Sequence, residues 1–383
     1  MENKTDKAKP RQHMNGKLTV VVMIFAIILI ASVVMLFFVS KSIEARKGAD
    51  TQIKLSGQGG FSCEYSEAQK LYPFGDGVLK VTNDRAAYLT LSGNEVFSQV
   101  LSYSNPRCVT HNDYACVFDS DGYGLVALNK DGVMFASPVT NKIKSCYISD
   151  SGYFAVITDG GDAYGEVILY NNSGAVLSTW SSYNSGFPIC VAFDDDSSLM
   201  AVSTVNTSGA SAVPYIRLFS ISREKDSVDV SDLAIYTVPD SVVFANMMFI
   251  GKTVYAFSSD GIYKVRDGDL VKLRVDFSSV NYVRKVGGNM FVVYSDSVNQ
   301  LNKLAVINDS DNIIYRTDIG SDVNGITSVG NLCALSVDKR IFLIKSNGTI
   351  TGDIAVDEDV LRIGFIEYDK LCAVSTSGVH TVN

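Results

Sequence analysis

The feature that most constrains the fold of this chain is a repeat of about forty residues that runs from Phe61 to the C-terminus. Short β-rich runs alternate there with clusters of Gly, Asn, Asp and Ser, a pattern typical of many antiparallel strands. One recurring unit is a strand, a tight turn with glycine and a second strand. Its glycines are Gly93, Gly132, Gly174, Gly268 and Gly348. The first three are about forty residues apart and the later gaps are about twice as long.

A second recurring unit, an apolar strand with a small third residue, keeps the same register. It covers residues 114–117, 153–156, 199–202, 332–335 and 371–374. Four short strands per forty residues are typical of a β-propeller blade, in which small residues let blades pack face to face. We therefore predict an all-β fold, a β-propeller of about eight four-stranded blades. The predicted blades begin near residues 67, 105, 141, 185, 239, 280, 320 and 358.

The two ends of the repeat region predict how the ring closes. The last unit contains only three strands, Val360–Ile366, Lys370–Ser375 and Gly378–Val382, while Phe61–Ser66 precedes a complete first blade. We expect Phe61–Ser66 to pair with the C-terminal blade, because this pairing would hide both sheet edges. Seven blades remain an alternative if the long fourth unit divides differently.

An apolar segment, Leu18–Val39, precedes the repeats and contains no charged residue. As a helix it would be about 33 Å long, enough to cross a hydrocarbon core of roughly 30 Å. A cleaved signal peptide is the alternative, but its apolar region would be shorter and the following residues offer a poor cleavage site. We therefore predict a transmembrane helix over 18–39 that contacts the lipid bilayer.

Basic residues predict the orientation of this helix. Residues 1–17 contain Lys4, Lys7, Lys9, Arg11 and Lys17, whereas only Lys41, Arg46 and Lys47 follow closely. The positive-inside rule then makes 1–17 a cytoplasmic basic tail and 61–383 an extracellular β-propeller. The glycines within residues 40–60 predict a flexible linker. The expected location is the cell membrane, with a single pass.

Cysteine, histidine and sequence motifs give little sign of chemistry. The seven cysteines show no CxxC spacing and recur at packing positions, which favours buried thiols, although a Cys108–Cys116 disulfide remains an alternative. Only His13, His111 and His380 are present, and no HExxH, GxSxG or phosphate-binding loop occurs. A GxGxxA match at 122–127 opens a predicted strand rather than a helix. We assign no catalytic, cofactor-binding or metal-ligating residue and expect no cofactor.

Acidic turns and two long loops remain as candidate binding features. Asp119, Asp121 and Asp194–Asp196 could hold calcium, but Asp is common in turns on both predicted faces of the ring. The fourth unit alone has long segments, Thr204–Pro214 and Ser222–Asp232, which we expect to be loops. Long loops on a rigid scaffold often bind ligands, although a tolerated insertion is equally consistent.

One repeat resembles a known type. Val167–Gly174, followed by Trp180, is similar to the quinoprotein-type propeller repeat, in which an apolar strand ends in a glycine turn before a tryptophan. Trp180 comes later than in that repeat and is the only Trp, so no cofactor-binding residue carries over. The whole arrangement resembles an uncharacterised family of single-pass membrane-anchored β-propeller proteins from Gram-positive bacteria, with distantly quinoprotein-like or WD40-like repeats. This resemblance implies a location and a fold.

Two classes of function fit these expectations. The first is a non-catalytic binding or scaffold module for an envelope protein or a cell-wall polymer, favoured because no reactive constellation is present. The alternative is a glycan- or peptide-acting lyase or hydrolase with its site at the propeller axis. An axial pocket with converging Asp or Glu and Arg would favour the enzyme, and a flat or plugged axis would favour binding. The net charge of −8 argues against a nucleic-acid partner.

Overall fold

A computed structural model describes residues 54–55, 59–223, 227–238, 242–259, 261–275, 277, 279–296, 301–320, 323–368 and 370–382. The predicted basic tail 1–17, the predicted transmembrane segment 18–39 and most of the predicted linker 40–60 lie outside this range. Within the described part of the chain, no helix is both long enough and apolar enough to span a bilayer.

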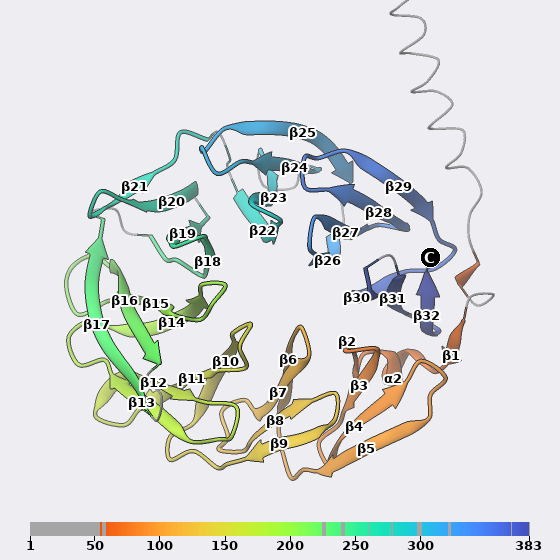
Figure 1. Cartoon of the computed structure of the whole chain (residues 1–383), viewed down its shortest axis with the longest axis horizontal. Helices are drawn as coiled ribbons and strands as arrows, with labels where there is room; N and C mark the ends of the chain where they lie inside the picture. The colour runs from red at the N-terminus through yellow and green to blue at the C-terminus, as the bar shows by residue number, and fades with distance from the viewer. Residues whose placement is uncertain are drawn as a thin grey trace, which may run out of the picture. The chain divides into compact units, whose positions relative to one another are not determined.

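The described strands form eight four-stranded antiparallel sheets arranged around a ring (Figure 1), which confirms the eight-bladed propeller and rules out seven blades. In chain order, blades one to four comprise β2 (Leu71–Phe74), β3 (Gly77–Val81), β4 (Arg85–Thr90), β5 (Glu95–Val100); β6 (Pro106–His111), β7 (Tyr114–Asp119), β8 (Leu125–Asn129), β9 (Gly132–Ala136); β10 (Ile143–Ile148), β11 (Phe154–Gly160), β12 (Ala163–Tyr170), β13 (Val176–Ser181); and β14 (Phe187–Phe193), β15 (Leu199–Asn206), β16 (Val213–Arg223), β17 (Val228–Thr237).

Blades five to eight continue the same order from the inner to the outer strand. They comprise β18 (Asn246–Ile250), β19 (Thr253–Ser258), β20 (Gly261–Arg266), β21 (Asp269–Lys272); β22 (Ser279–Val286), β23 (Asn289–Ser295), β24 (Asn302–Ile307), β25 (Ile313–Gly320); β26 (Val323–Val329), β27 (Leu332–Val337), β28 (Arg340–Lys345), β29 (Ile350–Ala355); and β30 (Val360–Glu367), β31 (Lys370–Ser375), β32 (Gly378–Val382), with β1 (Gly60–Ser62) as the outer strand.

The burial pattern of a strand depends on its place in the blade, and it differs between second strands and outer strands. Second strands such as β7 and β23 are buried along almost their whole length, because a neighbouring blade covers each of their faces. Outer strands such as β25 alternate between exposed and partly buried residues, as expected for a strand with one solvated face. The period-two pattern of the sequence therefore survives mainly at the rim of the ring.

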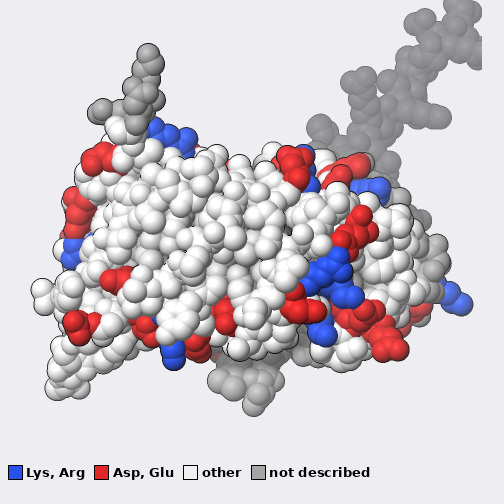
Figure 2. Space-filling view, turned by 90° about the horizontal axis from the view of Figure 1, so that it is seen from below, with Lys and Arg blue, Asp and Glu red and all other residues white. Residues whose placement is uncertain are grey.

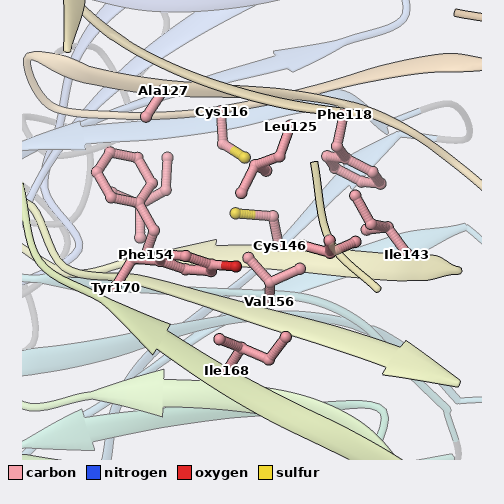
Figure 3. Packing of buried hydrophobic residues seen from close by; sticks show 12 residues of the cluster. Cys116, Phe118, Leu125, Ala127, Ile143, Cys146, Phe154, Val156, Ile168 and Tyr170 are labelled. Atoms are coloured by element: carbon pink, nitrogen blue, oxygen red, sulfur yellow. The ribbon is translucent and has the colours of Figure 1, made fainter. Parts of the chain in front are cut away.

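The core is divided into eight clusters of buried apolar residues, one between each pair of neighbouring blades. Figure 3 shows the cluster between blades two and three, where Cys116 and Leu125 of blade two face Cys146 and Val156 of blade three. Because each cluster joins two blades, a blade depends on both neighbours for its burial, as in other repeat folds.

Blade eight is completed by the N-terminal strand. β1 pairs antiparallel with β32, and Phe61 lies opposite Val379. The Phe61 ring also lies against Gly93, in the turn between β4 and β5 of blade one. The strand is shorter than the predicted Phe61–Ser66, because the chain turns into a four-residue helix, α2 (Tyr65–Ala68), whose Ala68 is buried between blades eight and one.

The expectation of two long loops is only partly correct, whereas the expectation of free thiols is confirmed and the alternative of a Cys108–Cys116 disulfide is wrong. Within Thr204–Pro214 the loop is confined to residues 207–212, because β15 and β16 extend and pair as far as Asn206–Val213. Within Ser222–Asp232, residues 222–223 belong to β16 and residues 228–232 to β17, and these strands pair as far as Arg223–Val228. Cys108 and Cys116 are free thiols. Cys108 is paired with Val117 rather than with Cys116, so the two side chains point to opposite faces of the blade.

Candidate axial binding site

The first strand of each blade lies nearest the axis of the ring (Figure 1). Since all blades share one strand order, the turns that join first to second strands lie on the same face of the ring. We call this face the turn face. Side chains from the ends of the first strands and from these turns therefore converge around the axis, and they form the candidate site.

Two cavities open at this position. The first, the Arg362 cavity, has a volume of about 560 Å³ and is lined by β2, β26, β30 and the end of β6. The second, the Lys285 cavity, has a volume of about 610 Å³ and is lined by parts of β10, β14, β18 and β22. The lining residues that the two cavities share are His111, Asn112, Arg284, Ser328 and Val329. We call the two together the axial site, and each is in the size range of a small-molecule or peptide side-chain pocket.

Arg284 occupies the junction between the two cavities. It lies near the end of β22, and its Nε donates a hydrogen bond to Ser328 Oγ of β26 at 3.1 Å. The surrounding protein desolvates the guanidinium and lowers the pKa of Arg284, while the charge of Asp150 acts in the opposite direction. The side chain as a whole is only half-buried, because part of its surface faces the cavity rather than protein atoms. An arginine remains charged under these conditions.

Arg362 provides a second guanidinium in the Arg362 cavity. Its Cζ lies 4.3 Å from the centre of the Tyr72 ring, which is a cation–π contact between blades eight and one. Its Nη1 donates a hydrogen bond to the carbonyl oxygen of Leu71 at 3.3 Å. Among the described residues, neither Arg284 nor Arg362 has a carboxylate within 4.0 Å.

Carboxylates at the rim of the Lys285 cavity are already paired. Asp150 accepts hydrogen bonds from His111 Nε2 at 2.6 Å and Asn112 Nδ2 at 2.8 Å, and the contact with His111 is the main reason that the pKa of Asp150 is lowered. Asp195 pairs with Lys285, which links the turn of blade four to blade six across blade five. Charged groups at this rim therefore hold the blades together and also restrict the entrance.

The same turn of blade four forms a second ionic link, to a lysine of blade five. The Lys252 ammonium contacts Asp194 at 2.5 Å, Asp196 at 2.7 Å and Ser198 Oγ at 2.7 Å. These contacts join blade four to the β18–β19 turn of blade five, and the link to Lys252 is the main reason that the pKa of Asp196 is lowered. On the side of the ring shown in Figure 2, acidic and basic groups also lie in small mixed groups. Exposed arginines such as Arg107 and Arg316 also lack a described ion pair, but Arg284 and Arg362 differ from them because they are half-buried and line a cavity.

This arrangement is suited to binding an anionic group. His111 and Asp150 form a pair of the kind that activates nucleophiles, but within the described residues no hydroxyl or thiol is hydrogen-bonded to His111. The pKa of Asp150 is lowered rather than raised, which is unsuitable for a general acid near neutral pH. A guanidinium that is desolvated by the protein, such as that of Arg284, by contrast forms strong charge-assisted hydrogen bonds with carboxylates or phosphates.

The acidic residues that the sequence analysis considered for calcium do not converge. Asp119 accepts a hydrogen bond from the backbone N–H of Asn105 at 2.7 Å, and Asp121 pairs with Lys144 at 2.6 Å. In the part of the chain that the structure describes, no three His, Cys, Asp or Glu residues are placed to hold a metal ion. These aspartates instead stabilise turns and connect strands.

The GxGxxA match at 122–127 precedes and enters β8 of a hairpin, as expected.

The sequence analysis did not identify Arg284 and Arg362. A signal was present in the repeat itself, because Arg362 lies opposite Val374 as Cys108 lies opposite Val117 and Cys146 opposite Val156. A register alignment of the first strands therefore places a charged residue where blades two and three have a cysteine. The position of the guanidinium relative to the axis could not be derived without the tilt of the blades.

Comparisons with known structures support the fold. The structure of BamB from Moraxella catarrhalis is 13% identical, with a TM-score of 0.51 over 86% of this chain and 98% of that one. Apo AztD from Citrobacter koseri is 10% identical, with a TM-score of 0.52 over 81% and 89%. Sqt1 from Chaetomium thermophilum, bound to the N-terminus of the ribosomal protein L10, is 12% identical, with a TM-score of 0.50 over 80% and 93%. At these identities the likeness concerns the fold alone.

Comparison at the level of sequence gives one result. No curated protein matches the chain. Residues 54–383, which include the whole described ring, match the model of a family of unknown function, DUF5711. The chain therefore belongs to the DUF5711 family.

Proposed function

We propose that this protein is a membrane-anchored, extracellular and non-catalytic binding module that holds an envelope protein at the axial site. The observation that carries the proposal is the convergence of Arg284 and Arg362, two guanidinium groups without a carboxylate partner among the described residues, in an open cavity on a rigid ring. Desolvating a charge is costly unless a partner compensates it, so such groups are typical of binding sites.

The architecture is consistent with this role. Eight interlocking blades fix the positions of the axial side chains, and preorganised groups lose little entropy when a ligand binds. The Sqt1 structure, bound to the N-terminus of another protein, is an example of a chain of this fold with a peptide ligand. A peptide terminus or an extended segment of a partner would also fit cavities of 560 and 610 Å³.

The anchor is part of the proposal. Leu18–Val39 would hold the protein in the membrane, with residues 1–17 inside and the ring outside. A linker over residues 40–60 could extend at most ~70 Å, so the partner should lie close to the membrane surface. Partners of this kind include other membrane proteins and newly exported chains.

The alternative function, a lyase or hydrolase at the axis, has weaker support. The axis does contain a pocket with a desolvated arginine, which is one half of the pattern expected for an enzyme. The other half, a carboxyl group with a raised pKa, does not occur at Asp150, and Asp195 is paired with Lys285. The arrangement therefore favours binding over acid–base chemistry.

Chemical cross-linking in intact cells, followed by mass spectrometry of the purified full-length chain, tests the proposal. Lys252 lies on the turn face and Lys144 lies near the opposite face, and both are about half exposed, so they form a matched pair of reporters. We expect cross-links from Lys252 to an envelope protein and few from Lys144. Cross-links only at Lys144, recovery of a cell-wall polymer instead of a protein, or the absence of any partner would contradict it.

A further inference from the structure

We propose that the axial site recognises a carboxylate group of its partner, with Arg284 and Arg362 as the residues that bind it. This inference rests on the proposed function and deepens it, because it names the chemistry of the ligand. Both guanidinium groups line the same cavity, and both are left without a carboxylate by the described residues of the ring itself.

Arg284 is the main recognition residue in this account. Among the residues that the structure describes, Arg284 donates one hydrogen bond, from Nε to Ser328, and the Ser328 hydroxyl in turn donates to the carbonyl oxygen of Lys285 at 2.9 Å. This chain of hydrogen bonds fixes the plane of the guanidinium. A planar, fixed guanidinium is well suited to bidentate binding of a carboxylate.

Arg362 is held in a similar way but by different contacts. The Tyr72 ring lies against its guanidinium and the Leu71 carbonyl oxygen accepts one N–H. Stacking on an aromatic ring restricts the side chain and leaves other N–H groups for a ligand. Two arginines in one cavity therefore provide two separate donors from two different blades, Arg284 from blade six and Arg362 from blade eight.

The rim explains why a carboxylate is favoured over phosphate. Acidic residues line the axial site, namely Asp76, Asp113, Asp150, Asp194, Asp195 and Glu367. They would repel a doubly charged phosphate or a polyphosphate chain more strongly than a singly charged carboxylate. Apolar residues such as Ile326, Ile363 and Phe365 line the same cavity and could contact the aliphatic part of an acidic side chain.

Calorimetric titration of the purified full-length chain can test this inference. The probe is a tripeptide with blocked ends and a central glutamate, and its glutamine analogue and inorganic phosphate are the comparisons. We expect saturable binding of the glutamate peptide and at least ~10-fold weaker binding of the glutamine analogue, because hydrogen bonds to charged groups contribute about 1.5–3 kcal/mol. Tighter binding of phosphate, equal binding of the two peptides, or no saturable binding of any probe would overturn the proposal.

Variants connect the binding to the two arginines. Arg284→Met and Arg362→Met should each weaken binding of the glutamate peptide at least ~10-fold. Arg85→Met should not, because Arg85 lies in β4, the third strand of blade one, where it pairs with Glu95. Wild-type affinity in both axial variants would overturn the assignment. If Arg284→Met fails to fold, Arg284→Lys tests the same point. Lysine keeps the positive charge but lacks the planar guanidinium, so this variant should also bind the glutamate peptide more weakly.

The two proposals can fail separately. Peptide binding to the purified chain without any partner cross-linked at Lys252 in cells would contradict the proposed function. A protein cross-linked at Lys252 without preference for the glutamate peptide would leave that function standing and overturn the carboxylate chemistry.

Discussion

Charged side chains in this ring have two different roles at the scale of single residues. Some of them join different blades through ion pairs, as Lys285 and Lys252 do at the turn of blade four. Arg284 and Arg362 instead remain without a carboxylate among the described residues. The first group contributes to stability and the second favours a ligand, so substitutions in the two groups should have different effects.

A half-buried pair between blades five and six offers a clear test of the stabilising group. Asp311 contacts Lys264 at 3.0 Å and accepts a hydrogen bond from the Tyr255 hydroxyl at 2.9 Å, and the side chains of Lys264 and Asp311 are only 16% and 20% exposed. Asp311→Asn should lower the free energy of unfolding by about 1–3 kcal/mol, because Lys264 would lose its charged partner. Urea unfolding followed by circular dichroism measures this change.

The matched control is Asp267→Asn. Asp267 is also a turn residue with positive φ, +53° against +63° for Asp311, so asparagine fits both backbones equally well. Its side chain is 94% exposed, and its only described ion pair, with Arg266, is long at 3.8 Å. This control should change stability by less than about 0.5 kcal/mol. Equal effects of the two substitutions would show that the interblade pair does not contribute.

Buried thiols give a second prediction at this scale. Burial raises the pKa of Cys190, Cys333 and Cys372 to about 12, whereas Cys63 is partly exposed. At pH 8 the three buried thiols should react with iodoacetamide roughly 1000-fold more slowly than an ordinary thiol, because the thiolate is the reacting species. Mass spectrometry of the native protein should therefore find Cys63 labelled first. Rapid labelling of Cys333 or Cys372 before unfolding would contradict the packing between blades.

At the scale of elements, ring closure depends on the three residues of β1. Gly60 has φ +138°, and a Cβ at this position would lie 1.9 Å from the carbonyl oxygen of Val379. Gly60→Ala should therefore separate β1 from β32 and lower the free energy of unfolding by about 1–3 kcal/mol. Amide hydrogen exchange of β32 should increase, because its edge would become exposed.

Gly132→Ala provides the control for this substitution. Gly132 has a similar φ of +154°, but a Cβ there would meet no atom within 4 Å. Both variants carry the same conformational strain, and only Gly60→Ala adds the clash with β32. Equal losses of stability, or unchanged hydrogen exchange in β32 of the Gly60 variant, would show that β1 does not close the ring.

Element number and order were predictable from the sequence because the repeat is regular. The turn glycines illustrate the reason, since Gly174 has φ +83° and a Cβ on it would lie 2.7 Å from the Phe135 ring of the preceding blade. The turn requires glycine at each of these positions, so the residue recurs, and at Gly174 the contact between blades requires glycine as well. The extension of β15, β16 and β17 was not predictable, because these strands contain many polar residues and a polar sequence is typical of a loop. In the structure such residues pair across the strands, as Arg217 does with Asp232.

At the scale of the whole molecule, the ring brings together residues that are far apart in the sequence. Cavity-lining residues come from the first strands of all eight blades, and no local motif marks them. The sequence therefore predicted the ring and the free cysteines at packing positions, but not the axial site. Arginines on separate strands acquire a common role only when the ring closes and brings Arg284 and Arg362 into one cavity.

The most direct test of the account is a photo-cross-linking amino acid placed at two positions of the full-length protein in living cells. Asn246 lines the axial site and is exposed, whereas Val100 is 79% exposed on the outer strand β5. The account predicts a cross-linked envelope protein at Asn246 and none at Val100, and it predicts that Arg284→Met weakens the adduct at Asn246. An adduct at Val100 alone, or one at Asn246 that Arg284→Met leaves unchanged, would contradict it.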